Sequence, residues 1–210
     1  MKPRKSLTTS WQTHEVDLAN RSVAAMGTVQ LLNHRKLALV CSRKCPGDVI
    51  LKTYDLARLV RGSGLAIVSG FHSTIEKDCL PILLRGSDPI IIVQGHRLST
   101  SRLPIEWQKA IRNGRLLLLS PFGENDRRVT TELAAERNRF VATISDDVLI
   151  PYATPGSKTE ADALSLLAAG RRVCTFDDRP GSLLDAGATV VMPNYFAPRA
   201  TLLAPVGGEQ

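Results

Sequence analysis

Short clusters of glycine, hydroxyl and basic residues follow several apolar segments of the sequence, and these residue types together favour anion binding. Backbone N–H groups at helix starts, hydroxyls and cations all attract negative charge, and phosphate is the natural ligand class. For any single cluster, the structural alternative is an ordinary N-cap or turn. The clusters are Cys41-Ser42-Arg43-Lys44, Ser69-Gly70-Phe71-His72-Ser73-Thr74, Gln94-Gly95-His96-Arg97, Ser120-Pro121-Phe122-Gly123 and Thr154-Pro155-Gly156-Ser157-Lys158-Thr159.

The elements that must position these clusters are seven short apolar segments that alternate with segments of helical spacing. This alternation predicts an α/β fold, with a doubly wound (Rossmann-like), mainly parallel sheet of about six or seven strands and helices on both faces. The carboxyl ends of such strands meet at one edge, where ligands bind, so we expect the clusters to lie there together. The apolar segments are 37–41, 65–70, 89–95, 115–120, 147–153, 172–176 and 188–192, and the helical segments are 49–62, 74–86 (with Pro81 expected to kink or split it), 104–114, 129–145, 157–170 and 181–186.

The chain of 210 residues is expected to have three regions. Residues 1–34 are predicted to form an N-terminal arm and a helix over 18–33, residues 35–192 a Rossmann-like domain, and residues 193–210 a loose C-terminal tail. No apolar run approaches the length of a transmembrane helix, and the basic start is not followed by the apolar stretch of a signal peptide. We therefore expect a cytoplasmic protein with no membrane partner.

The net charge of +7 is confined to the first third of the chain. Residues 1–61 hold 11 Lys and Arg against 4 Asp and Glu, whereas residues 62–210 hold 16 of each kind. Within the basic third, residues 35–61 alone carry seven cations and two anions. This asymmetry indicates a polyanionic partner that meets the first strand-to-helix unit, with simple solubility as the alternative.

Several enzyme classes are disfavoured by missing motifs. No G-x-G-x-x-G follows the first apolar segment, and G-x-x-x-x-G-K-[ST] is absent, which argues against a dehydrogenase and a P-loop ATPase. Ser69 and His72 have no nucleophile elbow around them. The four cysteines form no C-x-x-C pair and are expected to be reduced thiols without a metal. We therefore predict no catalytic residue, no metal and no cofactor.

The order of several pieces resembles the Rossmann core of the DNA-processing protein A family (DprA, also called Smf), over about residues 36–192. This core is one branch of a superfamily that includes the lysine-decarboxylase-like phosphoribohydrolases. The resemblance implies a protein that binds single-stranded DNA in natural transformation and recombination, loads a recombinase, acts without known catalysis and often forms homodimers. The pieces are Ser42-Arg43, Ser69-Gly70, Glu136-Arg137-Asn138-Arg139, Gly156-Ser157, Ala168-Ala169-Gly170-Arg171 and Gly187-Ala188.

The resemblance also implies which residues bind the nucleic acid or its phosphates. Ser42 and Arg43 look like the family's Gly-Ser-Arg loop, and Ser69-Gly70 looks like its Ser-Gly-Gly loop. Residues 137–139 look like its Arg-Asn-Arg helix. Together with the clusters above, the expected set is Ser42, Arg43, Lys44, Ser69, Gly70, His72, Arg137, Asn138, Arg139, Gly156, Ser157, Lys158 and Thr159.

The sequence departs from the family pattern at the first two loops. Cys41 stands where the family has glycine, and Phe71 and His72 replace small residues after Ser-Gly. The bulk of Phe71 and His72 is expected to intrude where backbone would approach a phosphate. These departures indicate a divergent, short member of the family.

Three roles stay open at this stage. Arg137 shares a helical face with Leu133 and Phe140, so it must reach either a carboxylate or a ligand. Glu160 or Asp162 could take the place of a phosphoribohydrolase acid or base, although the glycine pattern around them is incomplete. The aromatic candidates for base stacking are Trp11, Phe71, Trp107, Phe122 and Tyr152. Of these, Phe71, Phe122 and Tyr152 fall at the predicted edge.

The leading hypothesis is therefore a DprA-like protein that binds single-stranded DNA at one sheet edge. The first alternative is a binder or hydrolase of a nucleotide-derived small molecule in the same place. The second alternative is a structural oligomer whose pocket is degenerate.

Overall fold

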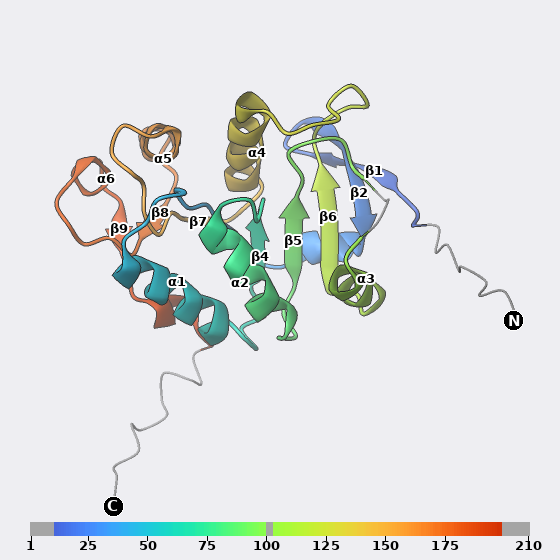
Figure 1. Cartoon of the computed structure of the whole chain (residues 1–210), viewed down its shortest axis with the longest axis horizontal. Helices are drawn as coiled ribbons and strands as arrows, with labels where there is room; N and C mark the ends of the chain where they lie inside the picture. The colour runs from blue at the N-terminus through green and yellow to red at the C-terminus, as the bar shows by residue number, and fades with distance from the viewer. Residues whose placement is uncertain (1–10, 100–102, 199–210) are drawn as a thin grey trace, which may run out of the picture.

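The structure, a computed structural model, describes residues 11–99 and 103–198. Its centre is one sheet with the strand order β1-β2-β6-β5-β4-β3-β7-β8-β9 (Figure 1). Strands β3 to β9 are parallel, whereas β1 pairs antiparallel with β2, and β2 antiparallel with β6. The parallel strands are β3 (Lys36–Leu39), β4 (Ala66–Ser69), β5 (Ile90–Val93), β6 (Leu116–Ser120), β7 (Asp147–Leu149), β8 (Val173–Thr175) and β9 (Thr189–Val190).

The middle of the parallel sheet is apolar because helices cover both of its faces, whereas polar residues such as Lys36, Ser120 and Asp147 stand at strand ends and the short β9 is exposed. Leu37 and Leu39 of β3 belong to one core cluster with α1 and α2, while Ala38 belongs to a second cluster with α4 and α5. The doubly wound α/β fold predicted from the alternation is confirmed, with the seven parallel strands at the seven apolar segments. The helices are α1 (Gly47–Leu59), α2 (Thr74–Leu84), α3 (Ile105–Arg112), α4 (Thr131–Thr143), α5 (Lys158–Ala168) and α6 (Ser182–Asp185).

The helix expected over 18–33 is wrong. Residues His14–Leu18 form β1, Arg21–Gly27 form β2, and only a 3-10 turn, η1 (Val29–Asn33), follows. Ala19 and Asn20, with φ of 52° and 60°, make the two-residue turn of a hairpin. Val23 and Ala25 both face the core, which is the two-residue period of a strand. Pairing of β2 with β6 stabilises this strand, and the weak helical spacing of the segment does not produce a helix.

A close approach of β2 and β6 depends on Gly27. Its φ is 109°, and a Cβ built there would stand 2.3 Å from the carbonyl oxygen of Leu116. Residues 14–27, which were expected to belong to an arm and a helix, thus extend the sheet. Residues 1–10 of the expected arm lie outside the described part of the chain.

Two further expectations differ from the structure. Pro81 lies inside α2 without splitting it, since the helix is anchored by a capping box at its start and buries Cys79 and Leu83 on either side of the proline. The start of the expected loose tail is ordered as η2 (Pro193–Phe196), because Phe196 is buried in the core cluster beside α1. Residues 199–210 of that tail are not among the described residues.

Across the described residues, no helix is long and apolar enough to cross a membrane.

Candidate nucleic-acid interface

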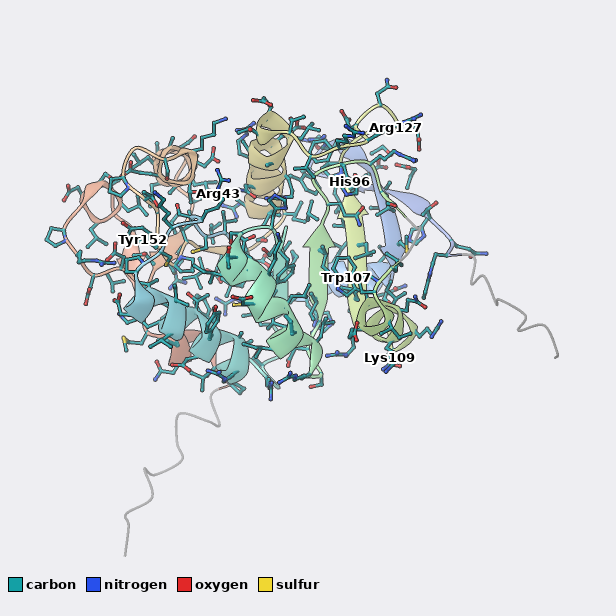
Figure 2. All side chains as sticks on the ribbon, in the orientation of Figure 1. Arg43, His96, Trp107, Lys109, Arg127 and Tyr152 are labelled. Carbon is teal, nitrogen blue, oxygen red and sulfur yellow. The ribbon has the colours of Figure 1, made fainter. Side chains whose placement is uncertain are left out.

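The loops that follow the parallel strands gather at one edge of the sheet, as the fold requires. Figure 2 shows Arg43, His96 and Arg127 toward this carboxyl edge, whereas Trp107 and Lys109 lie on α3 near the opposite ends of the strands. Helix α4 lies beside the upper ends of the strands in the same view (Figure 1) and carries Arg137. Residues from four strand-to-helix loops and from one helix can therefore contribute to a single surface.

Arg137 lies at the centre of this edge and is only 4% exposed. Its guanidinium rests directly on Gly70, where a Cβ would stand 2.3 Å from Nε. Gly95 lies close on another side, because a Cβ built there would be 3.4 Å from Nη1. Two glycines, after β4 and after β5, thus leave the space that the guanidinium occupies.

The partners of Arg137 settle part of the question that its sequence position left open. Nε and Nη2 donate to Asn138 Oδ1, at 3.2 and 2.8 Å. No carboxylate among the described residues forms an ion pair with Arg137, and Glu136, its neighbour, pairs instead with Arg21 at 3.0 Å. Burial lowers the pKa of Arg137, although the charge of Glu76 opposes that shift. Nη1 makes no hydrogen bond within residues 11–99 and 103–198, so both of its N–H groups are left for a ligand.

A buried carboxylate, Glu76 of α2, organises the first two loops. Its Oε1 accepts from the N–H of Cys41 at 2.9 Å, and its Oε2 accepts from the N–H groups of His72 and Ser73 at 2.9 and 3.3 Å. Ser73 Oγ in turn accepts from the N–H of Glu76, which completes a capping box. These N–H groups are therefore occupied by the protein itself. Sequence reasoning missed Glu76, although the Ser73-x-x-Glu76 spacing is the signature of such a box.

The hydroxyls of Ser42 and Ser69 hold loops together. Ser42 Oγ accepts from the N–H of Thr154 at 3.0 Å, and the N–H of Ser42 donates to the carbonyl of Tyr152, which ties the β3 loop to the β7 loop. Ser69 Oγ accepts from the N–H of Phe71 at 3.0 Å. Both serines are buried, so the geometry gives them a positioning role, and direct contact with a ligand stays a prediction.

The expected intrusion of Phe71 is wrong. Its φ is 46°, an uncommon left-handed conformation for a residue other than glycine, and this backbone turn directs the ring into the core cluster, where it is 6% exposed. Gly70 therefore keeps its open contact with Arg137. Holding Phe71 in that conformation costs on the order of 1–3 kcal/mol, and such strain is usual at binding sites.

His72 is exposed beside Gly70 and lies in a positive field. Burial of the ring is the largest cause that lowers the pKa of His72, and the charges of Arg137, Lys77 and Arg43 act in the same direction. Those three side chains come from α4, α2 and the β3 loop. Desolvation is thus the main cause of the lowered pKa of His72, and cations from three elements add to it on this part of the edge, with Glu76 acting against them.

Unpaired cations surround this centre. Arg43 and Lys44 are exposed and form no ion pair with any described residue, and the same is true of Lys158. Arg139 differs, because it faces Asp162 at 3.6 Å. Sequence reasoning missed Arg127 and Arg128, which are exposed in the loop after β6 and likewise unpaired among the residues described; two adjacent arginines after a strand were the available signal.

In the last predicted cluster, over residues 156–159, polar groups of Gly156 and Ser157 already form hydrogen bonds within the protein. Glu160 Oε2 accepts from the N–H of Gly156 at 2.6 Å, Ser157 Oγ caps α5, and Ser182 Oγ donates to Glu160. Thr159, at the start of the same helix, is half-buried. These hydrogen bonds, from Ser182 first, lower the pKa of Glu160, which makes it a poor proton donor. With Asp162 facing Arg139, neither carboxylate is placed as a free acid or base.

The aromatic candidates contribute little exposed ring at the edge. Phe71 and Phe122 are buried, and Tyr152 is covered by the guanidinium of Arg179, whose Cζ lies 5.4 Å from the ring centroid. Trp11 lies under Arg112, and Trp107 lies on α3 at the other end of the strands (Figure 2). This surface therefore offers a ligand mainly charged groups and few exposed rings for base stacking.

A doubly wound sheet whose carboxyl edge holds a buried arginine and cations, none with an ion-pair partner among the described residues, defines a Rossmann-like protein with a basic edge where this fold places its ligands. The family described as "DNA recombination-mediator protein A" matches residues 12–201, and the chain belongs to this family. No curated protein matches the sequence.

Solved structures of the same fold come from several bacteria. DNA processing protein A (DprA) from Streptococcus pneumoniae is 20% identical, with a TM-score of 0.66 over 90% of this chain and 73% of that one. DNA processing protein A from Helicobacter pylori, described for its single-stranded DNA binding mode, is 22% identical, with a TM-score of 0.70 over 92% of this chain and 97% of that one. The molybdenum cofactor binding protein from Rippkaea orientalis is more distant, with 13% identity and a TM-score of 0.50 over 76% of this chain and 91% of that one.

Proposed function

We propose that this protein binds single-stranded DNA along the carboxyl edge of its sheet and acts in DNA recombination as a mediator without catalysis. The observation that carries this proposal is Arg137, a buried guanidinium that lacks an ion-pair partner among the described residues, packs on Gly70 through Nε and keeps Nη1 without a hydrogen bond beside Gly95. A buried cation without a carboxylate is costly in the free protein, and a phosphate at Nη1 would offset that cost.

The exposed cations extend the contact beyond one phosphate. Arg43 and Lys44 lie on one side of the edge and Arg127 on another, with His72 near Arg43 and Arg137 (Figure 2). A strand that crosses the edge would meet the cations of the β3 and β6 loops and, between them, the guanidinium of Arg137, which lies against the loops after β4 and β5. With few exposed rings, most of the affinity should come from phosphate contacts and should fall steeply with salt.

Family membership supports further parts of the proposal. We infer that the DNA-bound protein works with a recombinase, that the protein acts in the cytoplasm and that it forms a homodimer. A nucleotide-derived small molecule is the competing ligand, because the N–H groups of Nη1 would donate equally well to a single phosphate.

The test is fluorescence anisotropy of a labelled oligothymidylate at a series of salt concentrations. Arg43→Ala and Arg127→Ala should each weaken binding and each reduce the slope of log affinity against log salt by about 1. Lys109→Ala is the matched control, because Lys109 is an exposed cation on α3, away from the edge (Figure 2). Absence of binding at low salt, or equal weakening by Lys109→Ala, would show the proposal to be wrong.

A further inference from the structure

The guanidinium of Arg137 is held by the side-chain oxygen of Asn138, the next residue of α4. Nε and Nη2 of Arg137 donate to Asn138 Oδ1, at 3.2 and 2.8 Å. Only the amide oxygen of Asn138 fits here, because its NH₂ group is a donor and would oppose the N–H groups of the guanidinium. No other residue within 11–99 and 103–198 accepts a hydrogen bond from this side chain. The amide of Asn138 therefore orients the guanidinium.

Two carboxylates that act on the surroundings of Arg137 are engaged by other groups. Glu136 precedes Arg137 in α4, but its Oε1 accepts from Nη1 and Nη2 of Arg21 in β2, at 3.0 and 3.1 Å. Nη2 of Arg21 also donates to the carbonyl of Pro121 at 2.6 Å, which fixes the Arg21 side chain. The charge of Glu76 raises the pKa of Arg137, but both Glu76 oxygens accept from backbone N–H groups. The acceptor that bonds Arg137 is thus a neutral one.

The charge of this acceptor decides how strongly Arg137 attracts an anion. A neutral amide and a carboxylate both accept from two N–H groups of a guanidinium, but only the carboxylate compensates the positive charge. Arg137 is 4% exposed, so water screens its charge much less than that of a surface arginine. A buried cation that is oriented by a neutral oxygen therefore keeps its attraction for a phosphate at Nη1.

We propose that Asn138 is a positioning residue, which orients Arg137 through a neutral oxygen and so leaves the charge of the guanidinium to a phosphate of the ligand. Asn138 acts through Arg137, since the two N–H groups of Arg137 occupy both lone pairs of Oδ1. A carboxylate at position 138 would take the place of the phosphate as the ionic partner. The identity of the ligand rests on the proposed function, whereas the effect of position 138 on the free protein does not.

The direct test is Asn138→Asp in the full-length protein, because this variant replaces the amide with a carboxylate of nearly the same shape. The urea midpoint of unfolding should rise, since the buried cation gains an ion pair. Oligothymidylate binding should weaken by about tenfold or more, and the slope of log affinity against log salt should fall by about 1. Stability and affinity thus change in opposite directions, which a purely structural role of Asn138 would not produce.

Two further variants separate charge from orientation. Asn194→Asp makes the same change of charge at an exposed residue of η2, which packs with α1 on the other face of the sheet from α4. It should leave the affinity and the salt slope close to the wild-type values. Asn138→Ala removes the acceptor but keeps the charge of Arg137, so it should lower the urea midpoint and the affinity with the salt slope unchanged.

Several results would overturn the proposal. These are wild-type affinity or a lowered urea midpoint in Asn138→Asp, a reduced salt slope in Asn138→Ala, and equal weakening of binding by Asn194→Asp. A parallel titration with inorganic phosphate, followed by ³¹P NMR, separates this proposal from the proposed function. If the wild-type protein binds phosphate more tightly than Asn138→Asp but binds no oligonucleotide, the positioning role stands and the proposed function fails. If the wild-type protein binds neither probe, both are wrong.

Discussion

The guanidinium of Arg137 and the Cα of Gly70 are in contact, so that a Cβ at position 70 would stand 2.3 Å from Nε and 2.4 Å from Cζ. This contact joins α4 to the loop after β4 and fixes the position of the guanidinium, whose Nη1 has no hydrogen bond among the described residues. Four predictions follow from this contact and its surroundings.

Gly70→Ala should weaken oligonucleotide binding by displacing Arg137. The backbone of Gly70 is not in the left-handed region, so the only conflict is with the buried guanidinium, and overpacking of this kind costs about 1–3 kcal/mol of stability. Gly123→Ala is the control, because nothing lies within 4 Å of its Cβ position. Anisotropy and urea unfolding measure both effects, and normal binding by Gly70→Ala would count against the site.

Arg137→Met should separate binding from stability. Removing a buried cation without an ion pair should leave the free energy of unfolding within about 1 kcal/mol of the wild-type value or raise it. Loss of a charge-assisted phosphate contact should reduce affinity by about tenfold or more, since such contacts contribute about 1.5–3 kcal/mol. A loss of several kcal/mol in urea unfolding, with DNA affinity retained, would instead assign Arg137 a structural role.

Glu76→Ala should destabilise the protein strongly. The N–H groups of Cys41, His72 and Ser73 would lose their acceptor together, and one buried unsatisfied donor alone costs about 1–3 kcal/mol. Glu106→Ala, in the exposed first turn of α3, is the comparison and should cost less than about 1 kcal/mol. Thermal and urea unfolding of both variants provide the measurement, and similar losses would show that the bonds of Glu76 contribute little.

His72 should make stability depend on pH in a defined direction. Its pKa is lowered in the folded state, so the unfolded chain binds the proton more readily. The contribution of neutral His72 is therefore fully present above the unfolded pKa of about 6.5 and is lost as the pH falls through the lower folded pKa. His72→Gln should flatten the unfolding free energy over that acidic range, and His14→Gln, at an exposed position of β1, serves as the control. An unchanged pH profile in His72→Gln would show that the cations around it do not act on the ring.

The alternation of apolar and helical segments in the sequence was enough to predict the parallel sheet and the edge where the loops meet. Each of the seven segments is mainly apolar, with its polar residues near the ends, and that pattern is a local property of the chain. The hairpin of β1 and β2 was not predictable in the same way. Its period of two is weak along residues 14–27 and becomes decisive only when β2 pairs with β6, about a hundred residues later.

The candidate site, like the fold, was predictable from the sequence only in part. Sequence order and residue type indicated an anion-binding edge with Arg43, Gly70 and Arg137, because strand ends and helix starts are local features. Tertiary structure alone decided that Glu136 pairs with Arg21, that Phe71 turns into the core and that Glu76 occupies the loop N–H groups. A side chain's partner depends on which distant backbone leaves space for it, as Gly70 and Gly95 do for Arg137. Residue types along a chain therefore determine what a site can attract, and long-range packing determines which groups remain free to do so.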